Sequence, residues 1–182
     1  MSKQAIIGLI WLLSVVFSAE ISAKVYYSKQ EALDLAFGKE ATVEMVSLFL
    51  TDAQRKAIER LGHIPLESNL FTFYVGKRGG KTTGYAAIET HTVRTKPETL
   101  LVVLSPEGHL QKVVVLAFHE PPEYEPPGRW FAQLNHVAIG ALRLGGGVEG
   151  ITGATLSARA SLDSVRKVRA IYEVAVAGRE TE

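Results

Sequence analysis

A short stretch rich in glycine and hydroxyl-bearing residues is the part of this sequence best suited to chemistry. It runs from Glu149 to Ser157, reads Glu-Gly-Ile-Thr-Gly-Ala-Thr-Leu-Ser, and follows the triple glycine Gly145–Gly147. A loop of this kind at the start of a helix offers unpaired backbone N–H groups and the positive end of the helix dipole. Both features favour an anion, so the stretch is a candidate phosphate site.

The side chains of this stretch suit a bulky phosphate-bearing group. Gly153 and Ala154 are small enough to let such a group approach the backbone. The hydroxyls of Thr152, Thr155 and Ser157 could donate to a phosphate, and one of them could be esterified by it. The residues also permit a simpler interpretation, in which Thr152 or Thr155 is the N-cap of the following helix. Spacing alone favours the N-cap interpretation.

The string from Glu149 to Thr155 resembles the flavinylation motif Asp-x-x-Ser/Thr-Gly-Ala-Thr of the FMN-binding domain family. This family includes the exported flavin subunits of sodium-pumping quinone reductases and of Rnf-type redox complexes. The resemblance implies that a separate flavin transferase, using FAD and a divalent metal, joins FMN to the Thr155 hydroxyl through a phosphoester. Thr152, Gly153 and Ala154 would then surround the phosphate, and Glu149 occupies the acidic position of the motif.

The resemblance covers about residues 62–177 and implies a pocket for the flavin ring. Ser157 is a further expected contact of the cofactor. Candidates for the ring pocket lie in and around the proline-rich segment 120–128; they are His119, Glu120, Tyr124, Trp130 and Phe131. Two alternatives stay open here. Trp130 and Phe131 are more simply explained as core residues, and His119 as the exposed end of a strand.

The resemblance also implies a function. The chain would be an exported flavoprotein that carries electrons between a membrane-bound or periplasmic donor and acceptor, with the protein supplying binding and orientation for the flavin. It would be an electron-transfer module rather than a stand-alone oxidoreductase. The alternative is a module of the same fold that holds FMN or another phosphate ligand without a covalent bond, or holds none.

The N-terminus carries the pattern of an export signal. One positive charge, Lys3, precedes an uncharged apolar run from Ala5 to Ala19. A plausible cleavage site follows after Ala23, with Ile21 and Ala23 at the −3 and −1 positions. The run is shorter than the ~20 residues that span a bilayer as a helix, so residues 1–23 are expected to be a signal peptide. An uncleaved anchor formed by residues 5–23 is the alternative, and it would favour a membrane-anchored interaction protein. Either way, the expected location is periplasmic or otherwise extracytoplasmic.

Composition excludes several other classes of protein. The 182 residues include 20 Lys and Arg against 19 Asp and Glu, a net charge of +1, so no nucleic-acid partner is expected. The chain has no cysteine, which excludes disulfides, thiolate-bound metals and Fe–S clusters. The five histidines are isolated in the sequence, and no metal site is predicted.

Local signals predict two short helices early in the mature chain. The capping-box spacing of Ser28 and Glu31 begins the first helix, and Gly38 stops it. Thr51 caps the second helix, and Gly62 lies just beyond its end.

Alternating apolar residues separated by tight turns then predict four strands, at 71–75, 82–93, 100–104 and 113–116. Short turns between strands indicate an antiparallel meander. An amphipathic helix from Leu156 to about Ala177 completes the chain. The expected fold class is therefore α+β, an antiparallel sheet meander with flanking helices and a long C-terminal helix after the motif. The expected organisation is a signal peptide (1–23), an N-terminal helical segment packing on the domain (24–62), the FMN-binding domain (63–178) and a short tail (179–182).

Overall fold

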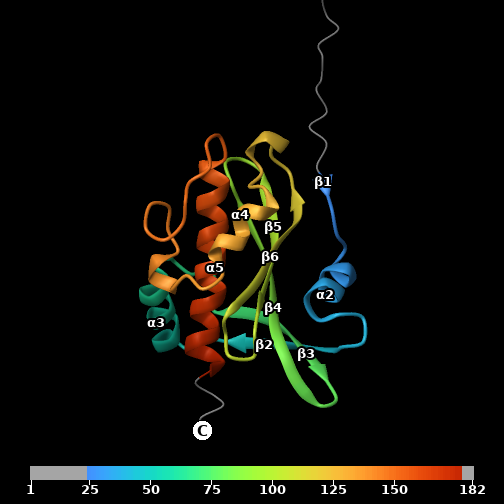
Figure 1. Cartoon of the computed structure of the whole chain (residues 1–182). Coiled ribbons are helices and arrows are strands. Elements are labelled where there is room, and N and C mark those ends of the chain that lie inside the picture. Colours follow the sequence, from blue (N-terminus) through green and yellow to red (C-terminus); the bar gives the residue numbers. More distant parts are fainter. Residues whose placement is uncertain (1–23, 178–182) are drawn as a thin grey trace, which may run out of the picture.

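The computed structural model describes residues 24–177, and the predicted signal peptide and C-terminal tail lie outside this range. Its centre is one antiparallel sheet of six strands in the order β1-β6-β5-β4-β3-β2 (Figure 1). The predicted α+β class with an antiparallel meander is confirmed. The strands are β1 (Lys24–Val25), β2 (Thr42–Phe49), β3 (Leu70–Arg78), β4 (Lys81–Thr92), β5 (Pro97–Leu104) and β6 (Leu110–Phe118).

Helices cover both faces of the sheet. Figure 1 shows α3 and α5 on one side and α2 on the other. Strand β5 is buried on both faces, and its residues alternate between two cores: Leu100 and Val102 point toward α5, whereas Leu101 and Val103 point toward α2. This alternation is the strand period of two acting between two helical layers. The longer helices are α2 (Lys29–Phe37), α3 (Asp52–Gly62) and α5 (Thr155–Ala175).

Both predicted N-terminal helices are confirmed, with their caps. The Ser28 hydroxyl accepts from the backbone N–H of Glu31, whose carboxylate accepts in return from the N-cap backbone. Thr51 caps α3 in the same way, with Gln54 as its partner. The end of α3 differs from the prediction, because Gly62 is its last residue and His63 forms the left-handed C-cap at φ 49°.

Residues 24–62 contribute more than the predicted helices. They also supply β1 and β2, which are the two edge strands of the sheet. Strand β2 escaped prediction because an edge strand keeps apolar side chains in solvent, and Met45 and Phe49 are 64% and 75% exposed. The sequence of β2 therefore lacks the regular alternation of apolar and polar residues that indicates a strand.

The segment between β6 and α5 begins at the upper end of the sheet in Figure 1, and its last 3₁₀ turn packs against α3 and α5. The proline-rich part includes the 3₁₀ turn η1 (Pro122–Tyr124). The short helix α4 (Gly128–Phe131) follows, with two further 3₁₀ turns, η2 (Ala132–Leu134) and η3 (Ile139–Ala141). Trp130 and Phe131 are buried together with Leu134 and anchor the segment to the main core, which confirms the simpler interpretation of the two aromatic residues.

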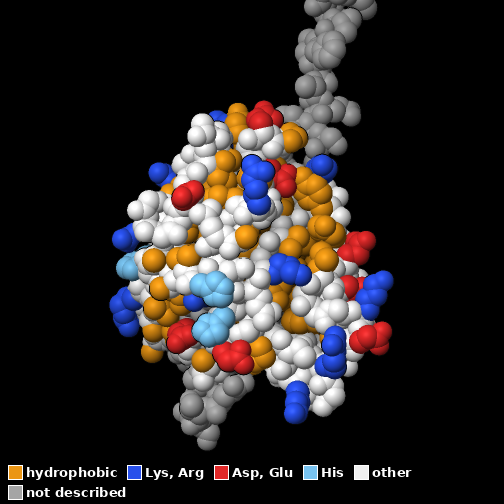
Figure 2. All heavy atoms as spheres, in the orientation of Figure 1, with side chains coloured by type: hydrophobic (Ala, Val, Ile, Leu, Met, Phe, Trp, Pro, Cys, Tyr) orange, Lys and Arg blue, Asp and Glu red, His pale blue; other side chains and the backbone are white. Residues whose placement is uncertain are grey.

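The surface is mixed in charge. On the face drawn in Figure 2, acidic and basic side chains are interspersed and do not gather by sign. None of the helices within residues 24–177 has the length and hydropathy to cross a membrane.

Candidate functional site

The motif loop enters α5 without a side-chain cap. The helix begins at Thr155 and its N-cap is Ala154, which makes no side-chain cap hydrogen bond. The Thr155 hydroxyl donates to the Ile151 carbonyl, 3.2 Å away in the preceding loop. The interpretation of Thr152 or Thr155 as the N-cap is therefore wrong. Because the cap position offers no side-chain acceptor, the first turn of α5 keeps the backbone donors that suit an anion.

Gly153 sets the direction in which the loop joins the helix. Its φ is +88°, in the left-handed region where residues with a Cβ are strained. Nothing lies within 4 Å of the position that a Cβ would take, so the surface above Gly153 is open. Thr152, Gly153 and Thr155 are exposed, whereas Ala154 is buried. The hydroxyl expected to be modified is thus accessible to another protein.

A tryptophan and a glutamine hold the start of the motif in place. The Trp130 indole N–H donates to the Glu149 carbonyl at 2.8 Å, and the Glu149 N–H donates to the Gln133 side-chain oxygen at 2.8 Å. Trp130 also packs edge-to-face on Phe131, with ring centres 5.1 Å apart. Both aromatic residues belong to the core, so the structure places Trp130 behind the loop as its anchor. The Glu149 side chain is exposed.

A small cavity of about 120 Å³ lies beside the first turn of α5. It is lined by Arg94, Tyr124 and the motif residues from Gly153 to Ser157. Ser157 is only 1% exposed, and its hydroxyl has no hydrogen-bond partner within residues 24–177. A buried hydroxyl without a partner is costly and calls for an explanation, for which a bound ligand is one. The volume suits a phosphate group and falls well below the roughly 300 Å³ of cavities that enclose drug-sized molecules.

Arg94 supplies the positive charge of this cavity. Its guanidinium stands 5.1 Å from the centre of the Tyr124 ring, a cation–π arrangement that holds both side chains at the cavity wall. A guanidinium binds phosphate oxygens through paired N–H donors. Arg94 comes from the turn between β4 and β5, far from the motif in sequence. No pattern in the sequence links the two, and the prediction missed Arg94 and Gln133.

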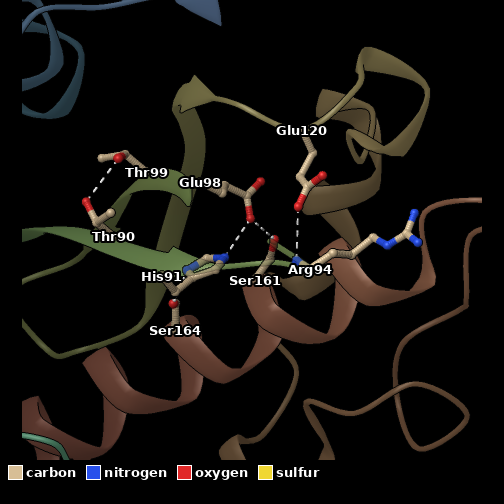
Figure 3. A network of polar contacts seen from close by, with 8 residues as sticks. All are labelled: Thr90, His91, Arg94, Glu98, Thr99, Glu120, Ser161 and Ser164. Carbon is tan, nitrogen blue, oxygen red and sulfur yellow. Dashed lines mark hydrogen bonds and ion pairs between the residues drawn. The ribbon is translucent and has the colours of Figure 1, made fainter. Parts of the chain in front are cut away.

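Glu120 determines where Arg94 stands. Its Oε1 accepts the backbone N–H groups of three successive residues, Arg94 at 3.2 Å, Thr95 at 2.7 Å and Lys96 at 2.9 Å. These bonds, that of Thr95 above all, lower the pKa of the Glu120 carboxyl below its usual range. Figure 3 shows the carboxylate directed at the Arg94 backbone nitrogen while the guanidinium points away from it. Glu120 was predicted in the ring pocket, and its carboxylate acts on the site by folding the Arg94 turn.

The structure brings together only part of the predicted set. Gly153, Ala154, Thr155, Ser157 and Tyr124 surround one cavity. Thr152, Glu149, Trp130 and His119 do not line it. His119 is half-buried at the end of β6, where its backbone N–H donates to the Pro97 carbonyl at 3.1 Å.

Comparison with protein-family models, with curated proteins and with solved structures found no significant match. Within residues 24–177, no group of three or more His, Asp or Glu side chains is arranged to hold a metal ion. The case for a function therefore rests on the sequence motif and on the geometry around it.

Proposed function

We propose that this chain is an exported flavoprotein that carries FMN on Thr155 through a phosphoester and passes electrons between membrane or periplasmic partners. The observation that carries the proposal is the buried, unpartnered hydroxyl of Ser157 in a cavity that Arg94 and the start of α5 also line. These are donors suited to a phosphate, and the motif residue Thr155 stands beside them. The donor set therefore fits the phosphate end of FMN.

Each residue has a defined part in holding the cofactor. Arg94 would pair with the phosphate oxygens, the Ser157 hydroxyl would donate to one of them, and the first-turn N–H groups of α5 would face the same charge. Tyr124 would keep the guanidinium in place through its ring. When bound, FMN supplies the electron transfer, which the cysteine-free chain has no thiol or Fe–S centre to provide.

Attachment requires a flavin transferase as the first partner. Esterification breaks the phosphoanhydride of FAD, forms the bond from the Thr155 oxygen to the FMN phosphorus, and releases AMP together with the hydroxyl proton. The Thr155 hydroxyl then loses its bond to the Ile151 carbonyl, since it no longer has a proton to donate. The exposure of Thr155 lets the transferase reach it.

The test is the intact mass of the full chain produced together with a flavin transferase. We expect a gain equal to FMN minus water, mapped to Thr155 by peptide fragmentation. Thr155→Ala should carry no flavin, whereas Thr155→Ser should still be modified because it keeps a hydroxyl. An unmodified mass, obtained while the same transferase modifies a known acceptor, would overturn the covalent proposal.

A second candidate is a non-covalent phosphate-ligand module of the same fold. The cavity supports it directly, because Arg94 and Ser157 suit a phosphate whether or not Thr155 is esterified. Titration of the unmodified chain with free FMN distinguishes the two. Tight binding that survives Thr155→Ala but is lost in Arg94→Ala would favour this second candidate.

A further inference from the structure

A second and larger cavity, of about 560 Å³, opens further along α5 and shares no lining residue with the motif cavity. One wall is apolar and comes from the α3–β3 connection, β3 and α5; it includes Ile64, Leu66, Phe71 and Ile171. Polar side chains from β4 and α5 also line the cavity; they include Glu89, His91, Ser164 and Lys167. Such a cavity suits a small molecule with an apolar part and a polar centre.

Two polar residues of this lining, Ser164 and His91, form a continuous hydrogen-bonded line with the buried Glu98. The Ser164 oxygen lies 2.8 Å from His91 Nδ1, and His91 Nε2 lies 2.7 Å from Glu98 Oε2. Ser161 donates to the same Glu98 oxygen at 3.0 Å. Figure 3 shows His91 between Ser164 on α5 and Glu98 on β5. Hydroxyl, imidazole and carboxylate therefore stand in series, which is the arrangement that activates a serine in hydrolases.

The burial of each residue fits these roles. Glu98 is fully buried behind the imidazole, and Ser164 is 4% exposed and lines the cavity. In the tautomer whose Nε2–H donates to Glu98, Nδ1 is the acceptor for the Ser164 hydroxyl proton. The two ring nitrogens are used in the opposite sense from the chymotrypsin arrangement, but their chemical tasks are the same.

We propose that Ser164 is a nucleophile, activated by His91 and positioned through Glu98, that acts on small esters entering this cavity. The Ser164 oxygen attacks the ester carbonyl while its proton passes to His91 Nδ1. The leaving alkoxide takes that proton, and an acyl-serine remains. Water then attacks the acyl group and gives its proton through His91 to the departing Ser164 oxygen. The step needs no oxidant, reductant or metal.

The lining also indicates which esters fit. Among the residues within 24–177 that line this cavity, Lys167 is the one Lys or Arg. It lies three positions after Ser164 on α5, which makes its ammonium the candidate to stabilise the oxyanion. It forms an ion pair with Glu89. Glu67, Glu89 and Asp163 make the lining rich in carboxylates, which disfavours anionic substrates. A neutral ester with a short alkyl acyl chain matches the apolar wall.

The test uses an alkyl fluorophosphonate on the purified full chain. Reaction forms a bond from the Ser164 oxygen to phosphorus and breaks the P–F bond, with fluoride leaving and the proton passing to His91. We expect one adduct by intact mass, mapped to Ser164. His91→Gln should slow labelling by about 10²-fold or more, because it removes the general base. Ser47→Ala, which removes an exposed serine of β2 outside the cavity, is the control and should be labelled at the rate of the native chain.

Glu98 is tested as a positioning residue with p-nitrophenyl butyrate. Glu98→Gln should lower kcat without raising KM, whereas a merely structural role would change thermal stability alone. Absence of any Ser164 adduct in the native chain, while a known serine hydrolase is labelled in the same tube, would overturn the proposal. Labelling of Ser164 at an unchanged rate in His91→Gln would overturn it as well. Neither result depends on Thr155, so the labelling of Ser164 tests the hydrolase proposal independently of the flavin proposal.

Discussion

Replacing Glu120 by Gln tests whether one carboxylate folds the turn that presents Arg94. The glutamine amide oxygen can still accept the three backbone N–H groups, but it does so without a charge. Hydrogen bonds to a charged acceptor exceed neutral ones by about 0.5–1 kcal/mol each. The bonds from Thr95 and Lys96 are short and that from Arg94 is longer, and solvent near the turn weakens all three. We expect a loss of about 1–2 kcal/mol in the free energy of unfolding at pH 7.

The size of this loss sets what the assay must resolve. For a chain of this length, 1–2 kcal/mol corresponds to a fall in Tm of roughly 2–8 °C. Urea denaturation followed by circular dichroism gives the free energy directly. Glu123→Gln is the matched control, because it removes the same charge from an exposed position in the same segment. This control should change stability by less than about 0.5 kcal/mol.

The pH dependence of the stability difference between the native chain and Glu120→Gln is the decisive measurement. The pKa of the Glu120 carboxyl is lowered in the folded chain, chiefly by the Thr95 N–H, so the native chain binds this proton less readily than the unfolded chain. Its stabilising effect is therefore complete above the ordinary carboxyl pKa of about 4.3 and is lost as the pH falls through the lowered folded value. The difference between the native chain and Glu120→Gln should shrink in acid. An equal difference at pH 7 and in strong acid would refute this reasoning, and so would an equal effect of Glu123→Gln.

Three further predictions concern the motif loop and the two cavities. Trp130→Phe should lower the free energy of unfolding by about 2 kcal/mol, because it removes the donor to the Glu149 carbonyl and leaves a smaller ring in the core. Thermal unfolding measures this loss, and Glu149→Ala is the control because it keeps that backbone carbonyl. Ser157→Ala should stabilise the ligand-free chain by up to about 1 kcal/mol, measured by denaturation, because the hydroxyl it removes is buried without a partner within residues 24–177. It should also weaken the binding of inorganic phosphate by about tenfold, measured by calorimetry. A less stable variant would contradict the absence of a partner for this hydroxyl. Burial raises the pKa of the Glu89 carboxyl, although Lys167 partly opposes this. The native chain should therefore lose stability as the pH rises from the ordinary carboxyl range toward the raised pKa. Glu89→Gln should abolish this dependence of stability on pH, and a dependence that persists in the variant would belong to another group.

The local signals in the sequence were sufficient for the helices and hairpins. Ser28 and Thr51 cap their helices through residues three positions further on, and such contacts depend on nothing distant. The turn after β5 likewise formed where its proline and glycine predicted it, because a turn depends on the φ preferences of a few adjacent residues. The sequence alone thus determined the fold class, and it predicted the stretch most suited to a phosphate.

Only the tertiary structure decided what stands around that stretch. Arg94, Glu120 and Ser157 come from three separate segments, and their meeting depends on how β4, β5 and the cover segment pack against the start of α5. The line from Ser164 through His91 to Glu98 is equally non-local, since it joins a helix to two strands across the core. Arg94 and the three residues of that line are unremarkable in the sequence, because a hydrogen bond between distant residues leaves no periodic pattern in either segment. Short-range geometry determined the elements, and long-range packing determined the sites.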